Sequence, residues 1–380
     1  MENRGTGCKC TFNNAPGDTL TRAQSVEPQA AVAPEPSQSV EQSFAGAYLT
    51  RTRMVATLGT LSAVTLLLMM IATAFGSVHI GLLRAIREPF SSDRAILLGA
   101  RMPRVCMGAA VGAVLAAVGA ALQALVRNPL AEGGILGISG GGAFGAILAL
   151  VLFAHTAMGD VLVPLCAFGA SLLSTVAVYR LAQLEGRLEP FTLLLIGVIF
   201  NAFWGAAIML VNSVVNFYFT HSIIFWLMGS FEAPTWEEVA MVGVAAVGGS
   251  AILFGLARAM NLLSLGDEEA SELGLDVARA RRTIFLITSI MIGAAVSVSG
   301  IISFVGLIVP HLLRLVLGAD HRLLLPASFI AGAAFTVAAD LIARIAIAPA
   351  ELPVGAITAF CGGPFFIFML RREGRKALAL

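Results

Sequence analysis

The sequence predicts an all-α integral membrane protein with about ten transmembrane helices. Hydrophobic residues make up 58% of its 380 residues and charged residues only 12%, whereas soluble domains carry about 25% charged residues. Apolar stretches close to the ~20 residues needed to cross a bilayer recur along the chain. Helices are one of the two structures that satisfy their own backbone hydrogen bonds in lipid, and stretches of this length indicate helices.

Each predicted span is an apolar stretch bounded by polar or basic residues. The ten spans are residues 54–75, 105–126, 140–153, 161–181, 191–211, 239–256, 284–299, 301–317, 324–346 and 354–370. The third, seventh and eighth are short for a bilayer. The seventh and eighth are barely separated, so a count of nine or eleven stays open.

Residues 1–48 are predicted as a disordered cytoplasmic tail ahead of a transmembrane domain over residues 49–380. The tail is rich in Ala, Pro, Ser, Gln and Glu, and this composition cannot bury a core. It lacks the features of a secretory signal. The five cysteines are scattered and form no disulfide framework, and Cys8-Lys9-Cys10 is at most half of a metal motif, so no metal site is predicted.

The distribution of basic residues predicts that both termini are cytoplasmic. With the N-terminus inside, fifteen Arg or Lys residues flank the spans on the inner side and six on the outer side. Five of the six outer arginines lie between the first two spans. They indicate either an amphipathic helix lying on the membrane or a cationic landing site for an acidic partner or an anionic substrate. Pro103 permits a helix to begin there, with Arg101 and Arg104 projecting from its outer mouth.

Residues 261–282 form a long polar interruption between two apolar segments on the predicted cytoplasmic side. Gly266 breaks the chain, and Asp267, Glu268 and Glu269 follow where a helix N-terminus favours negative charge. Gly274 has the position of a C-terminal cap, and a second short helical piece is expected at Val277–Arg282. The segment is therefore either a solvated connector or a docking surface.

Several tempting motifs in the apolar region carry no enzyme signal. A nucleophile-elbow pattern around Ser139 and a dinucleotide pattern at residues 140–145 both lack a preceding strand, so small residues for close helix packing explain them better. The only lysines are Lys9 and Lys376, so the chain has no P-loop. Its net charge of +1 suggests no nucleic-acid partner. No catalytic residue is predicted.

Three polar features lie at or inside the predicted spans. Asn128-Pro129-Leu130 ends the second span, as an ordinary turn or a pore-facing constriction. His311 lies inside the eighth span, where a structural hydrogen bond is favoured over a ligand role. Asp340 and Arg344 are one helical turn apart in the ninth span, which predicts an ion pair within that helix or a contact between helices.

Eight stretches, in order, resemble the permease subunits of iron-chelate, heme and vitamin B12 ABC importers, the ten-helix type II kind. Each stretch is weak alone, but the set covers residues 54–372. The stretches are RMPR (101–104), RNPLA with ILGIS (127–139), WLMGS (226–230), LGDEEASELG (265–274), SGIISFVGLIVPHLLR (299–314), DHRLLLP (320–326), ELPVG (351–355) and GGPFF (362–366).

The resemblance implies partners that the chain itself does not supply. It implies a homodimer in the lipid of a bacterial inner membrane, with the pathway between the two copies. Two copies of a separate ABC ATPase, which bind ATP and Mg, would dock from the cytoplasm. A periplasmic binding protein would deliver the substrate in Gram-negative organisms. No cofactor is implied on this chain.

The resemblance also assigns roles to residues. Arginines at the outer mouth, here Arg101, Arg104 and more weakly Arg344, would hold acidic residues of the binding protein. Coupling helices that contact the ATPase correspond to about residues 262–281, with Leu265, Gly266, Asp267, Glu268, Glu269, Ala270, Leu273 and Gly274 at their core. Asn128, Pro129 and Leu130 resemble an inner gate. A second gate falls near Glu189-Pro-Phe-Thr192, where the sequence departs from a well-known relative.

The expected function is a permease that moves an iron-containing chelate inward by alternating access, driven by a separate ATPase. Heme is the favoured substrate because Leu265–Ala270 and Ala348–Gly355 look closest to heme-importing members. Ferric siderophores and cobalamin stay open as alternatives. A secondary transporter working alone is disfavoured, because Asp340 is the only acid well inside a span. A non-transporting scaffold would need neither an Asn-Pro turn nor paired glycines.

Overall fold

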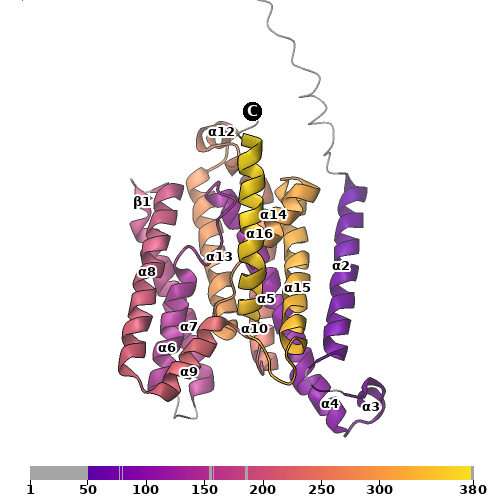
Figure 1. Ribbon diagram of the computed structural model, residues 1–380. Coiled ribbons are helices and arrows are strands. Elements are labelled where there is room, and N and C mark those ends of the chain that lie inside the picture. The colour runs from indigo at the N-terminus through magenta and orange to yellow at the C-terminus, as the bar shows by residue number, and fades with distance from the viewer. Residues whose placement is uncertain are drawn as a thin grey trace, which may run out of the picture. The chain divides into compact units, whose positions relative to one another are not determined.

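The structure is a computed structural model, and it describes residues 50–76, 78, 80–153, 156, 158–184 and 187–377. The predicted tail over residues 1–48 lies outside these residues. Within them the chain is a bundle of helices (Figure 1). The helices are α2 Arg51–Ala74, α3 Leu82–Arg87, α4 Ser92–Ile96, the π-helical turn η1 Leu97–Arg101, α5 Met102–Leu125, α6 Ile138–Phe153, α7 Gly159–Leu181, α8 Pro190–Val214, α9 Phe217–Met228, α10 Trp236–Gly255, α11 Ala257–Leu263, α12 Asp267–Glu272, α13 Val277–Ser299, α14 Val305–Leu317, α15 His321–Ile345 and α16 Val354–Ala377.

The helical prediction is confirmed, because each of the ten predicted apolar stretches coincides with a helix. Seven helical segments among the described residues are long and apolar enough to cross a membrane, while α6, α9, α14 and α16 contain shorter apolar stretches. A two-stranded hairpin of β1 Gln183–Leu184 and β2 Arg187–Leu188 joins α7 to α8.

One expected helix end and one expected helix start differ from the structure. The short helix expected at Val277–Arg282 is the beginning of α13, which continues to Ser299, so the seventh span is longer than predicted. Pro103 does not begin a helix, because α4, η1 and α5 follow one another without a break. The N–H of Met102 bonds to the carbonyl of Leu97, five residues earlier. This wider π turn lies directly before Pro103, which has no N–H to donate.

Helix α5 is the buried centre of the bundle and packs against α10, α13, α14 and α15. Its membrane-length window is 78% buried, against 6% for α2. Glycines permit the close approach: a β-carbon added at Gly112 would lie 2.3 Å from the carbonyl oxygen of Gly332, and one added at Gly119 would lie 1.9 Å from that of Gly306. Small residues therefore bring the backbones of α14 and α15 against α5.

The glycines of α6 serve packing, as predicted. A β-carbon at Gly145 would lie 2.5 Å from the β-carbon of Ala170 on α7, and one at Gly141 would lie 2.5 Å from that of Ser174. Ser139 is buried at the first turn of this helix. The patterns that resemble a hydrolase elbow and a dinucleotide loop are thus explained by the contact between α6 and α7.

Replacing Gly119 by Ala is expected to lower the melting temperature of the purified protein, because the added methyl group meets backbone atoms of Gly306 that cannot move independently. Overpacking of this kind costs about 1–3 kcal/mol. Gly169→Ala in α7 is the matched control, because nothing lies within 4 Å of its added β-carbon. Equal melting temperatures for the two variants would contradict the close-approach argument.

Candidate functional site

The end of the bundle that carries α12 holds the residues predicted to couple to an ATPase (Figure 1). Gly266 precedes α12 with φ 142°, and Asp267, Glu268 and Glu269 form the first turn. Ala270 is fully buried, while Leu265 and Leu273 are 61% and 62% exposed. Gly274, with φ 84°, donates its N–H to the carbonyl of Ser271, so it closes the helix as predicted.

This construction explains how a six-residue helix holds its shape. Isolated helices of such length are unstable in water, but α12 has a glycine at each end and buries Ala270. The N–H of Leu275 also bonds back to the carbonyl of Ala270. The segment Leu265–Leu273, called the knob below, therefore has a fixed shape. It exposes the side chains of two leucines, Glu268 and Glu269.

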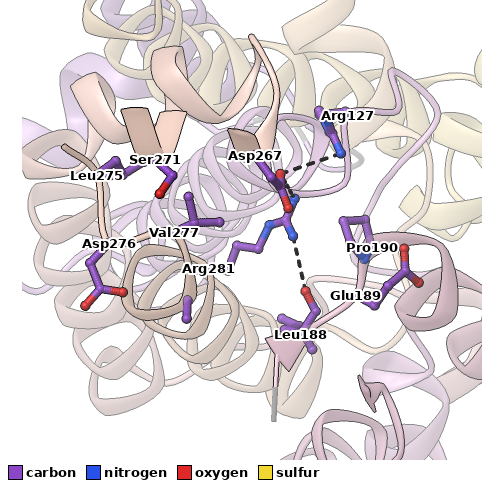
Figure 2. A pocket seen from close by; sticks show the side chains of 11 residues that line it. Arg127, Leu188, Glu189, Pro190, Asp267, Ser271, Leu275, Asp276, Val277 and Arg281 are labelled. Carbon is purple, nitrogen blue, oxygen red and sulfur yellow. Dashed lines mark hydrogen bonds and ion pairs between the residues drawn. The ribbon is translucent and has the colours of Figure 1, made fainter. Parts of the chain in front are cut away.

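Asp267 does not share the outward orientation of the two glutamates. Its Oδ1 accepts a hydrogen bond from Arg281 of α13 at 2.6 Å and lies 3.6 Å from the guanidinium of Arg127, directly after α5 (Figure 2). Arg281 also donates to the carbonyl of Leu188 at 3.2 Å. The sequence drew attention to the acids but not to these arginines, because no periodicity relates positions 127, 267 and 281.

A hollow of about 460 Å³ lies beside this cluster and is lined by residues of four segments. Arg127 comes from the end of α5, Glu189 and Pro190 from the start of α8, and Ser271 from α12. Glu189 caps α8 by accepting from the N–H groups of Phe191 and Thr192. These bonds lower the pKa of Glu189 against the raising effect of burial.

Asn128, Pro129 and Leu130 form a tight turn at the end of α5. The side-chain oxygen of Asn128 accepts from the N–H of Leu130 at 2.9 Å, and Arg127 has a positive φ of 49°. Gln123, one turn earlier, donates to the carbonyl of Gly306 and accepts from Arg314. The turn is therefore held locally, and its predicted role as an inner gate stays a prediction.

Glu132 follows this turn and is a polar residue that the sequence analysis did not single out. Its carboxylate accepts the backbone N–H of Phe304 at 3.0 Å. Phe304 has a positive φ of 69° and precedes α14, so the bond joins the loop after α5 to a strained helix start. Burial raises the pKa of Glu132 to about 7.

Glu132 also lines a second hollow, of about 550 Å³, at the surface formed by α6, α8 and α9. Most of its lining is apolar, with polar groups supplied by Glu132, Ser139, Asn201, Asn212 and Ser303. The side chain of Asn201 on α8 donates to the carbonyl of Gly134, which holds the loop after α5 against α8 at one side of this hollow. An apolar recess with few polar groups suits a large ligand that slides past without being held tightly.

At the opposite end of the bundle, the arginines predicted to hold a binding protein are turned inward. Arg101 is 6% exposed and donates to the carbonyls of Thr73, Ala74 and Val78. The expectation that Arg101 and Arg104 project from the mouth is thus wrong. Acceptors from segments distant in the sequence surround these side chains, and no local pattern revealed them.

Arg104 and Arg344 share the buried carboxylate of Asp340. Arg104 lies 3.0 Å from Asp340 and 2.6 Å from Glu351, while Arg344 lies 3.0 Å from the other oxygen of Asp340. Arg344 also donates to the carbonyls of Ala72 and Phe75. The predicted Asp340–Arg344 pair is confirmed, and the cluster joins α2, α5 and α15. The docking role of Arg101, Arg104 and Arg344 stays a prediction.

His311 is buried in α14. No group of three or more His, Cys, Asp or Glu side chains comes together in the parts of the chain that the structure describes.

Comparison with known proteins places this geometry in context. Residues 64–372 match the family model described as the FecCD transport family. A cobalamin import permease of Halobacterium salinarum is 44% identical over 73% of this chain and 74% of its own length. A hemin transport permease of Yersinia pestis is 38% identical over 81% of this chain and 94% of its own length.

A further relative and a solved structure agree with that match. An iron(3+)-hydroxamate import permease of Bacillus subtilis is 36% identical over 76% of this chain and 74% of its own length. An inward-facing structure described as a metal-chelate type ABC transporter superposes with a TM-score of 0.74. It covers 83% of this chain and 98% of its own at 30% identity.

Replacing Asp340 by Asn is expected to destabilise the protein by about 3–5 kcal/mol, because it leaves the buried guanidinium of Arg344 without its charged partner and leaves Arg104 only Glu351. The free energy of unfolding in mixed micelles measures this loss. Glu88→Gln breaks an ion pair between two exposed side chains, Arg84 and Glu88, and is the control with no measurable change. Equal losses in the two variants would contradict the assignment.

Glu132 is expected to make stability depend on pH. Its folded pKa of about 7 lies above the ordinary value of 4.5, so the folded state binds more protons between these values and stability falls as pH rises from about 4.5 to 7. The melting temperature of the wild type should therefore fall relative to Glu132→Gln between pH 5 and 8. Parallel curves for the two proteins would show that Glu132 titrates normally.

Proposed function

The chain belongs to the FecCD transport family, and from this premise we propose that it is the permease subunit of a type II ABC importer for a metal chelate. The observation that carries the proposal is the segment around α12, in which the exposed side chains of Leu265 and Leu273 flank a capped helix that carries the exposed Glu268 and Glu269 at one end of the bundle. Such a knob suits insertion into a groove of another protein. A chain without a P-loop needs an outside source of energy for active transport.

The proposed orientation places the α12 end in the cytoplasm and the α3–α4 end outside the inner membrane of a bacterium. The arginine count of the sequence supports this orientation. Two ATPase copies would dock on α12 of two permease copies. A binding protein would approach the opposite end, where Arg84 and Arg87 are exposed. The mostly buried side chains of Arg101, Arg104 and Arg344 would hold the structure of that end, and the exposed arginines would make the first contact with the binding protein.

The pathway is proposed to run between two copies of the chain along the 550 Å³ hollow of α6, α8 and α9. The apolar lining would let a bulky chelate pass, and the Asn128–Leu130 turn would close the α12 side as an inner gate. Alternating access would follow when ATP binding on the partner moves α12. The near absence of acids in the spans argues against a proton-driven transporter.

Heme is the proposed cargo, with cobalamin and ferric siderophores as alternatives. The likeness of Leu265–Ala270 and Ala348–Gly355 to heme-importing members supports this choice. The relatives carry names for hemin, cobalamin and ferric hydroxamate at similar identity, so selection by the binding protein fits all three. Heme and cobalamin are both large metal macrocycles, and an apolar recess suits either.

Uptake into proteoliposomes tests the proposal. The permease, with the ATPase and binding protein from adjacent genes, should accumulate hemin only when ATP is present. Cyanocobalamin and a ferric hydroxamate are the competing cargoes. Uptake of either in place of hemin would correct the cargo, and uptake without the ATPase would refute the ABC assignment.

The same preparation tests the docking knob. Leu273→Asp should reduce co-purified ATPase at least tenfold, because it places a charge at the centre of an apolar contact. Arg279→Gln is the control, since the side chain of Arg279 is 77% exposed and lies one turn into α13 rather than on α12. Unchanged ATPase recovery in Leu273→Asp would remove α12 as the docking element.

A further inference from the structure

We propose that Asp267 is a positioning residue that ties the docking helix α12 to the two segments at the mouth of the pathway, the turn after α5 and the start of α8. The inference rests on the proposed function of α12, and it changes the role of one acid that was expected to meet the ATPase. Glu268 and Glu269 stay available to that partner.

The orientation of the three acids separates their roles. Glu268 and Glu269 are exposed, whereas Asp267 turns toward the bundle and lies between Arg127 and Arg281 (Figure 2). One oxygen of Asp267, Oδ1, is the atom nearest to both guanidinium groups. A carboxylate shared in this way transmits a displacement of α12 to both arginines at once.

The ion pair between Asp267 and Arg281 is the stronger of the two contacts of Asp267. The side chain of Arg281 is only 5% exposed, and its bond to Asp267 is 2.6 Å long. A buried guanidinium separated from its acid would be left charged without a counterion. Arg281 also donates to the carbonyl of Leu188, two residues before α8 begins at Pro190. Helix α12, the start of α13 and the start of α8 are therefore held together.

The ion pair between Asp267 and Arg127 is the weaker of the two contacts. The two side chains are 43% and 40% exposed and the charged atoms are 3.6 Å apart, which is the geometry of a pair that contributes little to stability. Arg127 directly precedes the Asn128–Leu130 turn. A weak pair at that place opens and closes without unfolding its surroundings, so it suits a contact that changes during each transport cycle.

The hollow beside Asp267 supports a moving role for this corner. Arg127, which precedes the turn after α5, and Asp267 and Ser271 of α12 line this hollow, so the two segments are separated there by open space. Asp276 lines the same hollow but points away from the two arginines (Figure 2). It pairs instead with Arg279 and caps α13. Asp276 therefore serves as a matched carboxylate outside the link.

The test follows the turn after α5 in the assembled importer. A single cysteine replaces Leu130 in a chain whose five natural cysteines are changed to alanine, and the rate of maleimide labelling is measured with and without ATP and vanadate. The rate should change at least threefold with nucleotide in the parent protein. In Asp267→Asn this change should disappear, and ATPase recovery and basal ATP hydrolysis are measured in the same preparation.

Control variants separate positioning from folding. Asp276→Asn should keep the nucleotide-dependent labelling, because it removes a carboxylate from the same hollow without touching the link. Arg127→Gln removes only the weaker ion pair, between Asp267 and Arg127. It should abolish the nucleotide dependence of the labelling rate, as Asp267→Asn does. It decides the question even where Asp267→Asn fails to fold. Labelling that still responds to nucleotide in Arg127→Gln would overturn the inference.

The outcomes also distinguish this inference from the proposed function. Loss of the ATPase from Asp267→Asn, with Arg127→Gln unaffected, would make Asp267 a direct docking contact and reject the positioning role. No recovery of ATPase with the parent protein, or no nucleotide response at Leu130→Cys, would instead reject the importer assignment. If the labelling rate changes with nucleotide equally in the parent protein and in Asp267→Asn, the positioning role is rejected and the importer assignment is not affected.

Discussion

The fold depends on how closely α14 and α15 approach α5. At Gly112 and Gly119 the neighbouring backbone lies where any side chain would stand, so the contact forms only with glycine at these positions. In lipid the hydrophobic effect does not drive helices together, and close packing with internal hydrogen bonds must do so. Helix α5 is consequently held in position by its neighbours along most of its length.

A rigid α5 places the two functional ends of the chain on one element. Arg104, at its start, joins the Asp340 cluster. Arg127, just past its end, lies against Asp267 of α12. Each end is anchored by a carboxylate that faces two arginines, but the surroundings differ. Asp340 is almost fully buried, while Asp267 is 40% exposed. The ion pairs of Asp340 are therefore shielded from solvent, whereas the pair of Asp267 with Arg127 is exposed and weak.

The sequence predicted the helices well because membrane length and apolarity are local properties. It also predicted the Asp340–Arg344 pair, since the two residues are one helical turn apart. The partners of Arg101, Arg104 and Arg281 escaped prediction for the opposite reason. Asp340 is 236 residues from Arg104, and the carbonyl of Leu188 is 93 residues from Arg281. The acceptors of these arginines come from other segments of the chain, so no local pattern predicts them.

Helix α12 shows why a local pattern can be correct and still miss the contacts of one of its residues. Three acids after Gly266 do favour a helix N-terminus, and α12 forms there. Yet a helix of six residues has little stability of its own, so its angle to the bundle must be set by side chains. Asp267 is the member of the three that lies close to α13 and α5. The bond from Arg281 to Asp267 fixes how α12 lies against α13, even though the Asp267 side chain stays 40% exposed. The side chains of Leu265, Glu268, Glu269 and Leu273 are exposed beside it.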